Sequence, residues 1–365
     1  LEDGSTLAGD AAFTPKTKAI AFTGDLSLSP EFLKQQVSSL EAKAPFVARV
    51  TAIGTTENFS LNIDGESAEA LMNGAEIPAA ETSARLAGLP KEISAAISAS
   101  AIDQEGELTL LLKRAENGNI DAPRLHLESP SFDLSGAGSW NPSTEVLSID
   151  LSYDGVEGAQ PYPGVPLSGA ITAKGEIGRG ARQSDLHVTA KNASSGDVYV
   201  AQLELTAAGP ADKIKTNLKA SGLSAPGVGA METLAVDAAV NLAAAPIITL
   251  TRLDGERYSV PLSLLQPATL KFEDGVEAKN VRLRYGSEGE ISLDGRFAPT
   301  LWRASIAAKD LPLPEANGVA TFAFSLDTGK TQAASGDFTL QPLLSSSEAV
   351  TIGGEISWDG KRLHL

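Results

Sequence analysis

An alternation of apolar and polar residues with a period of two runs through most of this 365-residue chain. In residues 213–220, Ile214 and Leu218 share one side of the pattern while three lysines and an asparagine occupy the other. Residues 290–297 and 350–358 repeat it. Successive side chains of a β-strand point to opposite faces, so each segment has one dry face and one wet face. The sequence therefore predicts an all-β protein with a very long apolar face, and what covers that face decides the function.

Short turns rich in Gly, Asn and Asp separate these segments, as at residues 116–119 and 286–289. Such turns favour antiparallel neighbours joined as a meander. We expect strands at residues 20–28, 46–53, 59–63, 93–102, 107–114, 120–127, 131–140, 145–153, 167–177, 184–191, 197–207, 213–220, 234–242, 247–253, 268–273, 279–285, 290–297, 301–308, 320–326, 336–340 and 349–358.

Residues 1–130 are the less regular part, and we expect one or two short helices there. Ser29 and Pro30 predict the N-cap and first turn of a helix reaching residue 40. Residues 67–72 are interpreted as one or two helical turns closed by an Asn-Gly pair. Residues 131–365 are predicted to form regular β repeats, with Pro/Gly-rich stretches at 155–166 and 221–229 as candidate joints.

The charge balance limits the possible partners. The chain has 29 basic and 46 acidic residues, a formal net charge of −17, whereas surfaces for nucleic acid or anionic membranes need clustered Lys and Arg.

The chain has no cysteine, which excludes disulfides, thiolate metal sites and a cysteine nucleophile. No apolar run approaches the roughly 18–20 residues of a membrane helix. The chain starts at Leu1 without a signal-peptide pattern, so we expect a fragment of a longer protein.

No residue pattern predicts catalysis, a metal or a cofactor. The histidines His126, His187 and His364 are too scattered for a ligand set. Residues 175–180 are Gly-rich but lack the helix and the Lys-Ser/Thr pair of a phosphate loop. Residues 150–155 lack the spacing of a calcium loop. We therefore expect that the protein is not an enzyme; a polysaccharide lyase, for example, would need a converging acid–base cluster.

Three architectures accommodate so many half-apolar strands: paired sandwiches, closed barrels, and an open trough or solenoid. A membrane barrel would need aromatic girdles, and three Trp and five Tyr are too few and too scattered. Periodicity alone does not separate a sandwich from a trough.

A recurring cadence in the C-terminal half resembles a known family. It reads Pro-Ala-x-Leu at 267–270, Asp-Gly at 274–275, Gly-x-Ile-x-Leu-x-Gly at 289–295 and Leu-Pro at 311–312. Similar repeats occur at 166–175 and 318–326. This cadence resembles the TamB family of the translocation and assembly module, one of the AsmA-like bridge proteins of Gram-negative envelopes. The resemblance extends from about residue 140 to the end. Residues 1–130 share only the general character of the sequence and not the cadence itself.

The resemblance implies a long, mainly antiparallel meandering sheet curled into a U-shaped trough, or β-taco, with an apolar concave face. It also implies a periplasmic location, with an inner-membrane anchor in a segment absent from this chain. The implied function is to move phospholipid between the inner and outer membranes, to aid outer-membrane protein assembly, or both. The implied partners are phospholipid acyl chains and an outer-membrane protein of the TamA/BamA type. The alternative is a structural or adhesive protein of tandem β-sandwiches without lipid transport.

If the trough hypothesis holds, the apolar side of each strand lines a lipid groove. Acyl chains gain about 0.8 kcal/mol for each CH₂ removed from water, so such a face holds a lipid tail without a deep pocket. The alternative for the same side chains is an ordinary core. The predicted lining residues are Leu147, Ile149, Leu151, Leu167, Ile171, Leu203, Leu205, Ile214, Leu218, Leu270, Phe272, Val281, Leu283, Ile291, Leu293, Phe297, Phe322, Phe324, Ile352 and Ile356.

Overall fold

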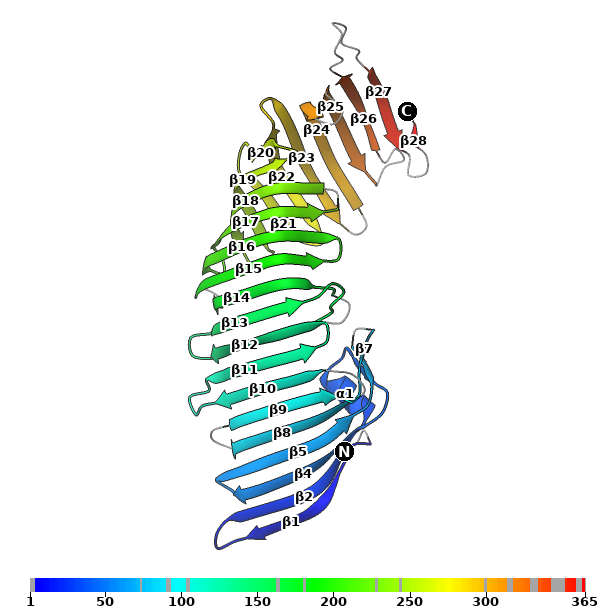
Figure 1. Cartoon of the computed structure of the whole chain (residues 1–365). Coiled ribbons are helices and arrows are strands. Elements are labelled where there is room, and N and C mark those ends of the chain that lie inside the picture. Colours follow the sequence, from blue (N-terminus) through cyan, green and yellow to red (C-terminus); the bar gives the residue numbers. More distant parts are fainter. Residues whose placement is uncertain are drawn as a thin grey trace. The chain divides into compact units, whose positions relative to one another are not determined.

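The fold is a long antiparallel β-sheet (Figure 1). The computed structural model describes residues 4–72, 74–89, 93–102, 106–161, 165–179, 182–226, 229–242, 245–298, 301–313, 318–328, 334–342, 352–358 and 363–364. Within these ranges, 25 strands belong to one meandering sheet and three short strands form a second one. The expected all-β class and the long antiparallel meander are thus confirmed.

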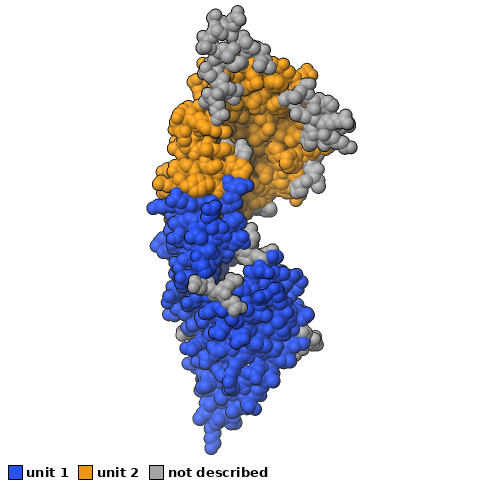
Figure 2. Space-filling view, turned by 45° about the vertical axis from the view of Figure 1, so that its right-hand side comes forward, with its two compact units in different colours: residues 1–177, 188–197 blue, residues 178–187, 198–365 orange. Residues whose placement is uncertain are grey.

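The chain divides into two compact units, coloured blue and orange in Figure 2. Unit 1 comprises residues 1–177 and 188–197, and unit 2 comprises residues 178–187 and 198–365. The strands β14 (Ser168–Gly178) and β15 (Gln183–Ser195) contribute residues to both units.

Unit 1 is a meander in which each strand pairs with its neighbours in the order β1–β2–β4–β5–β8–β9–β10–β11–β12–β13 (Figure 1). Its strands are eight to ten residues long, because turns interrupt the alternating pattern at that interval. They are β1 (Thr6–Thr14), β2 (Ala19–Leu28), β4 (Phe46–Thr55), β5 (Asn58–Ser67), β8 (Ala80–Leu89), β9 (Ile93–Ala101), β10 (Glu107–Arg114), β11 (Ile120–Ser129), β12 (Phe132–Asn141) and β13 (Val146–Gly155).

Unit 2 continues as a meander with one local departure: β19 pairs with both β20 and β21, and both of these pair with β22. Its strands are β16 (Val198–Pro210), β17 (Ile214–Ala225), β18 (Gly229–Asn241), β19 (Ile247–Arg257), β20 (Val260–Leu264), β21 (Ala268–Phe272), β22 (Val276–Tyr285), β23 (Gly289–Ala298), β24 (Leu301–Leu313), β25 (Gly318–Asp327), β26 (Ala334–Pro342), β27 (Ile352–Trp358) and β28 (Leu363–His364).

The helix α1 (Pro30–Gln36) forms where Ser29 predicts it, and the Ser29 hydroxyl accepts a hydrogen bond from the Phe32 N–H. It is shorter than expected, because Leu40 already begins β3 (Leu40–Ala42). The prediction of helical turns at 67–72 is wrong: β6 (Ala70–Met72) pairs there with β3 and β7 (Ala75–Ile77). Cross-strand pairing outweighs the weak local helix signal of so short a segment.

The stretch at 221–229 is not a joint between domains. The strand β17 continues to Ala225 and β18 starts at Gly229, so the stretch forms the end of a hairpin. The stretch at 155–166 does separate β13 from β14, and its residues 162–164 lie outside the described residues.

A β-bulge in β22 keeps the apolar residues of this strand on one face. The pairing with β23 jumps from Ala278 opposite Gly295 to Val281 opposite Leu293. Ala278 and Val281, three residues apart, therefore point to the same face of the sheet. In a strand without a bulge, they would point to opposite faces. Asn280 takes the left-handed conformation at the bulge, with φ 58°.

Asp294 of the neighbouring strand clamps this bulge. The Asn280 N–H donates to Asp294 Oδ1 and Arg282 Nη1 donates to Oδ2, both at 2.7 Å. The same device recurs in β24, where Asp310 has φ 50° and its N–H donates to Thr321 Oγ1 at 3.1 Å.

The clamp predicts a pH-dependent effect of Asp294→Asn. The hydrogen bond from the Asn280 N–H, followed by Arg282, lowers the pKa of Asp294. A carboxylate whose folded-state pKa is lowered adds stability above its unfolded-state pKa and loses it as the pH falls through the folded-state pKa. Because the pair is solvent-exposed, we expect a loss of at most about 1 kcal/mol in the free energy of unfolding at pH 7. The loss should shrink below about pH 4.

Urea denaturation from pH 7 down to pH 3 measures this difference. The exposed Asp337, on the same face of β26, gives the control Asp337→Asn, which should change little at any pH. A loss for Asp294→Asn that is equal at both ends of the pH range would contradict the electrostatic clamp.

Candidate functional site

The cross-strand register of unit 2 places its apolar side chains on one face. Directly opposed residues of an antiparallel pair point to the same side, so a row of partners traces one face across many strands. We call this surface the unit 2 apolar face. Its rows are Leu205–Leu218–Val236–Leu253; Leu203–Ala220–Leu234–Gly255–Leu262–Tyr285; Ile214–Val240–Ile248–Leu270–Ala278–Gly295–Ala304–Leu326; Phe272–Val276–Phe297–Trp302; Val281–Leu293–Ile306–Phe324; and Leu264–Leu283–Ile291–Ala308–Phe322–Phe338.

Unit 1 has an apolar face of the same kind. One of its rows is Leu151–Gly136–Leu125–Leu110–Ile97–Ala84–Ile63–Val50, which crosses eight strands. Leu147 is opposite Trp140, and Ile149 is opposite Gly138 in the parallel rows. In each unit, therefore, the backbone register alone assembles a wide apolar surface from single residues of many strands.

The register accounts for most of the predicted lining residues. Thirteen of them lie in the rows of the unit 2 apolar face: Leu203, Leu205, Ile214, Leu218, Leu270, Phe272, Val281, Leu283, Ile291, Leu293, Phe297, Phe322 and Phe324. Leu147, Ile149 and Leu151 lie in the rows of unit 1. The side chains of Ile352 and Ile356, in β27, lie outside the described residues.

Ile171 belongs to the apolar side of β14 in unit 1. Its neighbour Thr172 bonds to Thr189, and Lys174 bonds to Asp150 at 2.7 Å on the charged side of β13. Because side chains alternate along a strand, Ile171 points to the other face of the sheet from Thr172 and Lys174. Leu167 precedes β14, and its carbonyl accepts a hydrogen bond from the Tyr153 hydroxyl. Leu167 is thus part of a loop contact rather than of a row.

Large side chains on these faces stay partly exposed. None of the predicted lining residues with a described side chain is buried, and Leu147 and Phe272 are each 37% exposed. Trp302, beside Phe297, is 51% exposed. Of the 16 buried hydrophobic residues among those described, 12 are alanine. The best-buried positions thus hold small side chains, and the larger ones retain contact with solvent.

The accessible surface leads to the same conclusion. The protein exposes 21,900 Å², whereas a compact monomer of 37.7 kDa is expected to expose about 14,000 Å². The large apolar side chains that stay exposed, such as Trp302 and Phe272, are the part of this surface that an apolar partner or ligand would cover.

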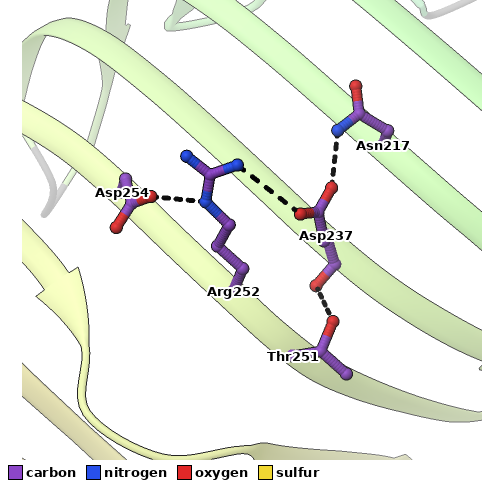
Figure 3. A network of polar contacts seen from close by, with 5 residues as sticks. All are labelled: Asn217, Asp237, Thr251, Arg252 and Asp254. Carbon is purple, nitrogen blue, oxygen red and sulfur yellow. Dashed lines mark hydrogen bonds and ion pairs between the residues drawn. The ribbon is translucent and has the colours of Figure 1, made fainter.

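The opposite face of unit 2 is charged, and its charges are mostly paired. Figure 3 shows one network, in which Arg252 donates to Asp254 at 2.5 Å and lies 3.8 Å from Asp237. Asn217 donates to Asp237 at 2.5 Å, and the Thr251 hydroxyl donates to the Asp237 carbonyl at 3.1 Å. The hydrogen bond to Asp254 raises the pKa of Arg252. The charged side chains of this face are thus in contact with solvent.

A hollow of about 760 Å³ on the charged face is lined by residues of β22 to β26. Its charged lining includes two ion pairs, Lys279 with Glu277 at 3.0 Å and Arg303 with Asp327 at 3.3 Å. His126 lies 3.4 Å from Glu128 and 3.7 Å from Asp133. Within the described ranges, no three His, Asp or Glu residues gather as a metal site would require, and no helix is long and apolar enough to span a membrane.

Comparisons of the chain with protein-family models and with curated proteins found no match. The candidate site therefore rests on the geometry of the two apolar faces.

Sequence reasoning missed several residues of these rows. Leu110, Leu125 and Ile97 were not predicted, because residues 1–130 were expected to be less regular. The signal was present, since Leu108 and Leu110 already alternate with polar residues. In unit 2, Phe338 and Val236 were missed. Their place in a row depends on which residue of the neighbouring strand lies opposite each of them, and a single sequence does not reveal that pairing.

Partial exposure predicts a modest cost for truncating a large side chain of the face. Ile291→Ala should lower the free energy of unfolding by less than about 2 kcal/mol, because the isoleucine is only half-buried. Met231, at 4% exposure, serves as the buried comparison, and Met231→Ala should cost about 2–5 kcal/mol. Urea denaturation measures both. Equal, large losses would show that the apolar face is a closed core.

Proposed function

We propose that the apolar faces bind the acyl chains of phospholipid and let them move along the sheet. The observation that carries this proposal is the continuity of the apolar rows, whose larger side chains remain half-exposed. An acyl chain lying on such a row gains about 0.8 kcal/mol for each CH₂ removed from water. Because the rows are uncharged along their length and have no deep pocket, no single position holds the chain much more tightly than the next.

The further elements of the proposal come from the TamB-like cadence. In the fold, Asp274-Gly275 is the turn between β21 and β22, Gly289 opens β23, and Leu311-Pro312 follows the bulge of β24. The cadence thus coincides with the turns and bulges that keep the rows in register. This supports a TamB-like protein whose sheet curls into a U-shaped trough.

In that proposal the protein works in the periplasm, anchored in the inner membrane by a segment outside this chain. It carries phospholipid between the inner and outer membranes, aids outer-membrane protein assembly, or does both. Its outer-membrane partner is a protein of the TamA/BamA type. The net charge of −17 disfavours nucleic acid as a ligand.

The test is native mass spectrometry of the protein produced in the periplasm of a Gram-negative bacterium, with lipid extraction of the same sample. We expect co-purified phospholipid. Ile291→Asp and Leu218→Asp add a charge to the unit 2 apolar face and should abolish the bound lipid, because a buried unpaired carboxylate is costly. Circular dichroism verifies that each variant folds.

The matched control is Ser292→Asp, one residue from Ile291 on the charged side of β23. It should retain the lipid. A lipid-free protein that also fails to bind added phospholipid would overturn the proposal and favour the structural or adhesive alternative.

A further inference from the structure

An arginine, Arg257, lies beside the unit 2 apolar face. Arg257 ends β19, and its cross-strand partner is Val260. Two and four residues earlier, Gly255 and Leu253 belong to the rows of the face. Strand alternation therefore places Arg257 on the same side. The residues that make up the rows are uncharged, and two charged side chains lie beside them at this end of the strands: Arg257, and Glu232 two residues before Leu234 on β18.

The fold holds this guanidinium at one end of the strands. Tyr258 and Ser259 form a two-residue turn with φ 51° and 59°, and the Arg257 Cζ lies 5.2 Å from the centroid of the Tyr258 ring. A Cβ on Gly229 would come within 2.8 Å of Arg257 Nη2, so the guanidinium lies directly over the Gly229 backbone. The Tyr285 hydroxyl donates to the Arg257 carbonyl at 3.4 Å.

Arg257 lacks the partner that a half-buried arginine usually has. Its Nε is buried without a hydrogen bond among the described residues, and none of their ion pairs includes it. The carboxylate of Glu232, on the adjacent strand β18, accepts a hydrogen bond at Oε1 from the Ser259 N–H at 3.3 Å. An anionic ligand at the guanidinium would supply the counter-charge that the ion pairs of the described residues do not give Arg257.

We propose that Arg257 binds the phosphate of a phospholipid whose acyl chains lie on the unit 2 apolar face. The inference rests on the proposed function and specifies its ligand. A guanidinium presents a planar set of donors that matches two phosphate oxygens. Its place at the β19–β20 turn puts the headgroup at the end of the strands, while Gly255 and Leu253 lead from there along the apolar rows.

The experiment compares two lipids with identical acyl chains, phosphatidylglycerol and diacylglycerol, which lacks the phosphate. Dissociation constants are measured for the wild type, Arg257→Met and Arg252→Met. Arg257→Met should weaken phosphatidylglycerol binding about tenfold, the size expected for loss of a charge-assisted hydrogen bond, and leave diacylglycerol binding unchanged. Arg252 is on the same strand but in the charged network of the other face (Figure 3), so Arg252→Met should change neither.

Each outcome bears on a distinct claim. If the wild type and Arg257→Met bind phosphatidylglycerol equally, the headgroup inference is overturned while the acyl-chain groove stands. If neither lipid binds to the wild type, the proposed function itself fails. Inorganic phosphate is the third ligand. Phosphate binding that Arg257→Met abolishes, with phospholipid affinity unchanged, would identify a site for a free anion and overturn the lipid assignment.

Discussion

Antiparallel hydrogen bonding between neighbouring strands determines which side chains share a face, and every functional feature of this protein depends on that register. A slip of one residue would move the apolar residues of a strand to the charged side. The bulge at Asn280, clamped by Asp294, resets the register where the sequence alternation changes phase. With the bulge in β24, it lets Leu283, Ile291 and Phe322 line up across strands whose apolar positions are out of phase in sequence.

The composition of the faces explains how a sheet with so much apolar surface remains a specific fold. Small residues such as Ala278 and Ala304 occupy the best-buried positions, where backbones and side chains crowd together. Larger residues such as Trp302 and Phe272 retain solvent contact. The large side chains therefore keep accessible surface, which the proposed acyl chains would cover. Arg257 adds to this surface a cation that makes no ion pair with the described residues.

Much of this architecture is predictable from the sequence, because strand alternation is a local property. The strands from β9 to β19 and the helix cap at Ser29 follow from pattern and turn chemistry. The strand β1 was missed because its Ala- and Gly-rich sequence alternates weakly, and β6 was taken for helix because three residues carry too little signal. The bulges and the position of Arg257 depend on pairing between strands, which a single sequence does not reveal.

The central claim is that lipid lies on one face of the sheet and not on the other. Site-specific photo-crosslinking along β23 tests it in intact cells, with a photoreactive amino acid placed at one position at a time. We predict crosslinks to phospholipid from Ile291, Leu293 and Phe297, whose side chains belong to the apolar rows, and none from Glu290, Ser292 and Arg296 on the charged face. Crosslinks without this period of two, or none to lipid at any position, would contradict the account.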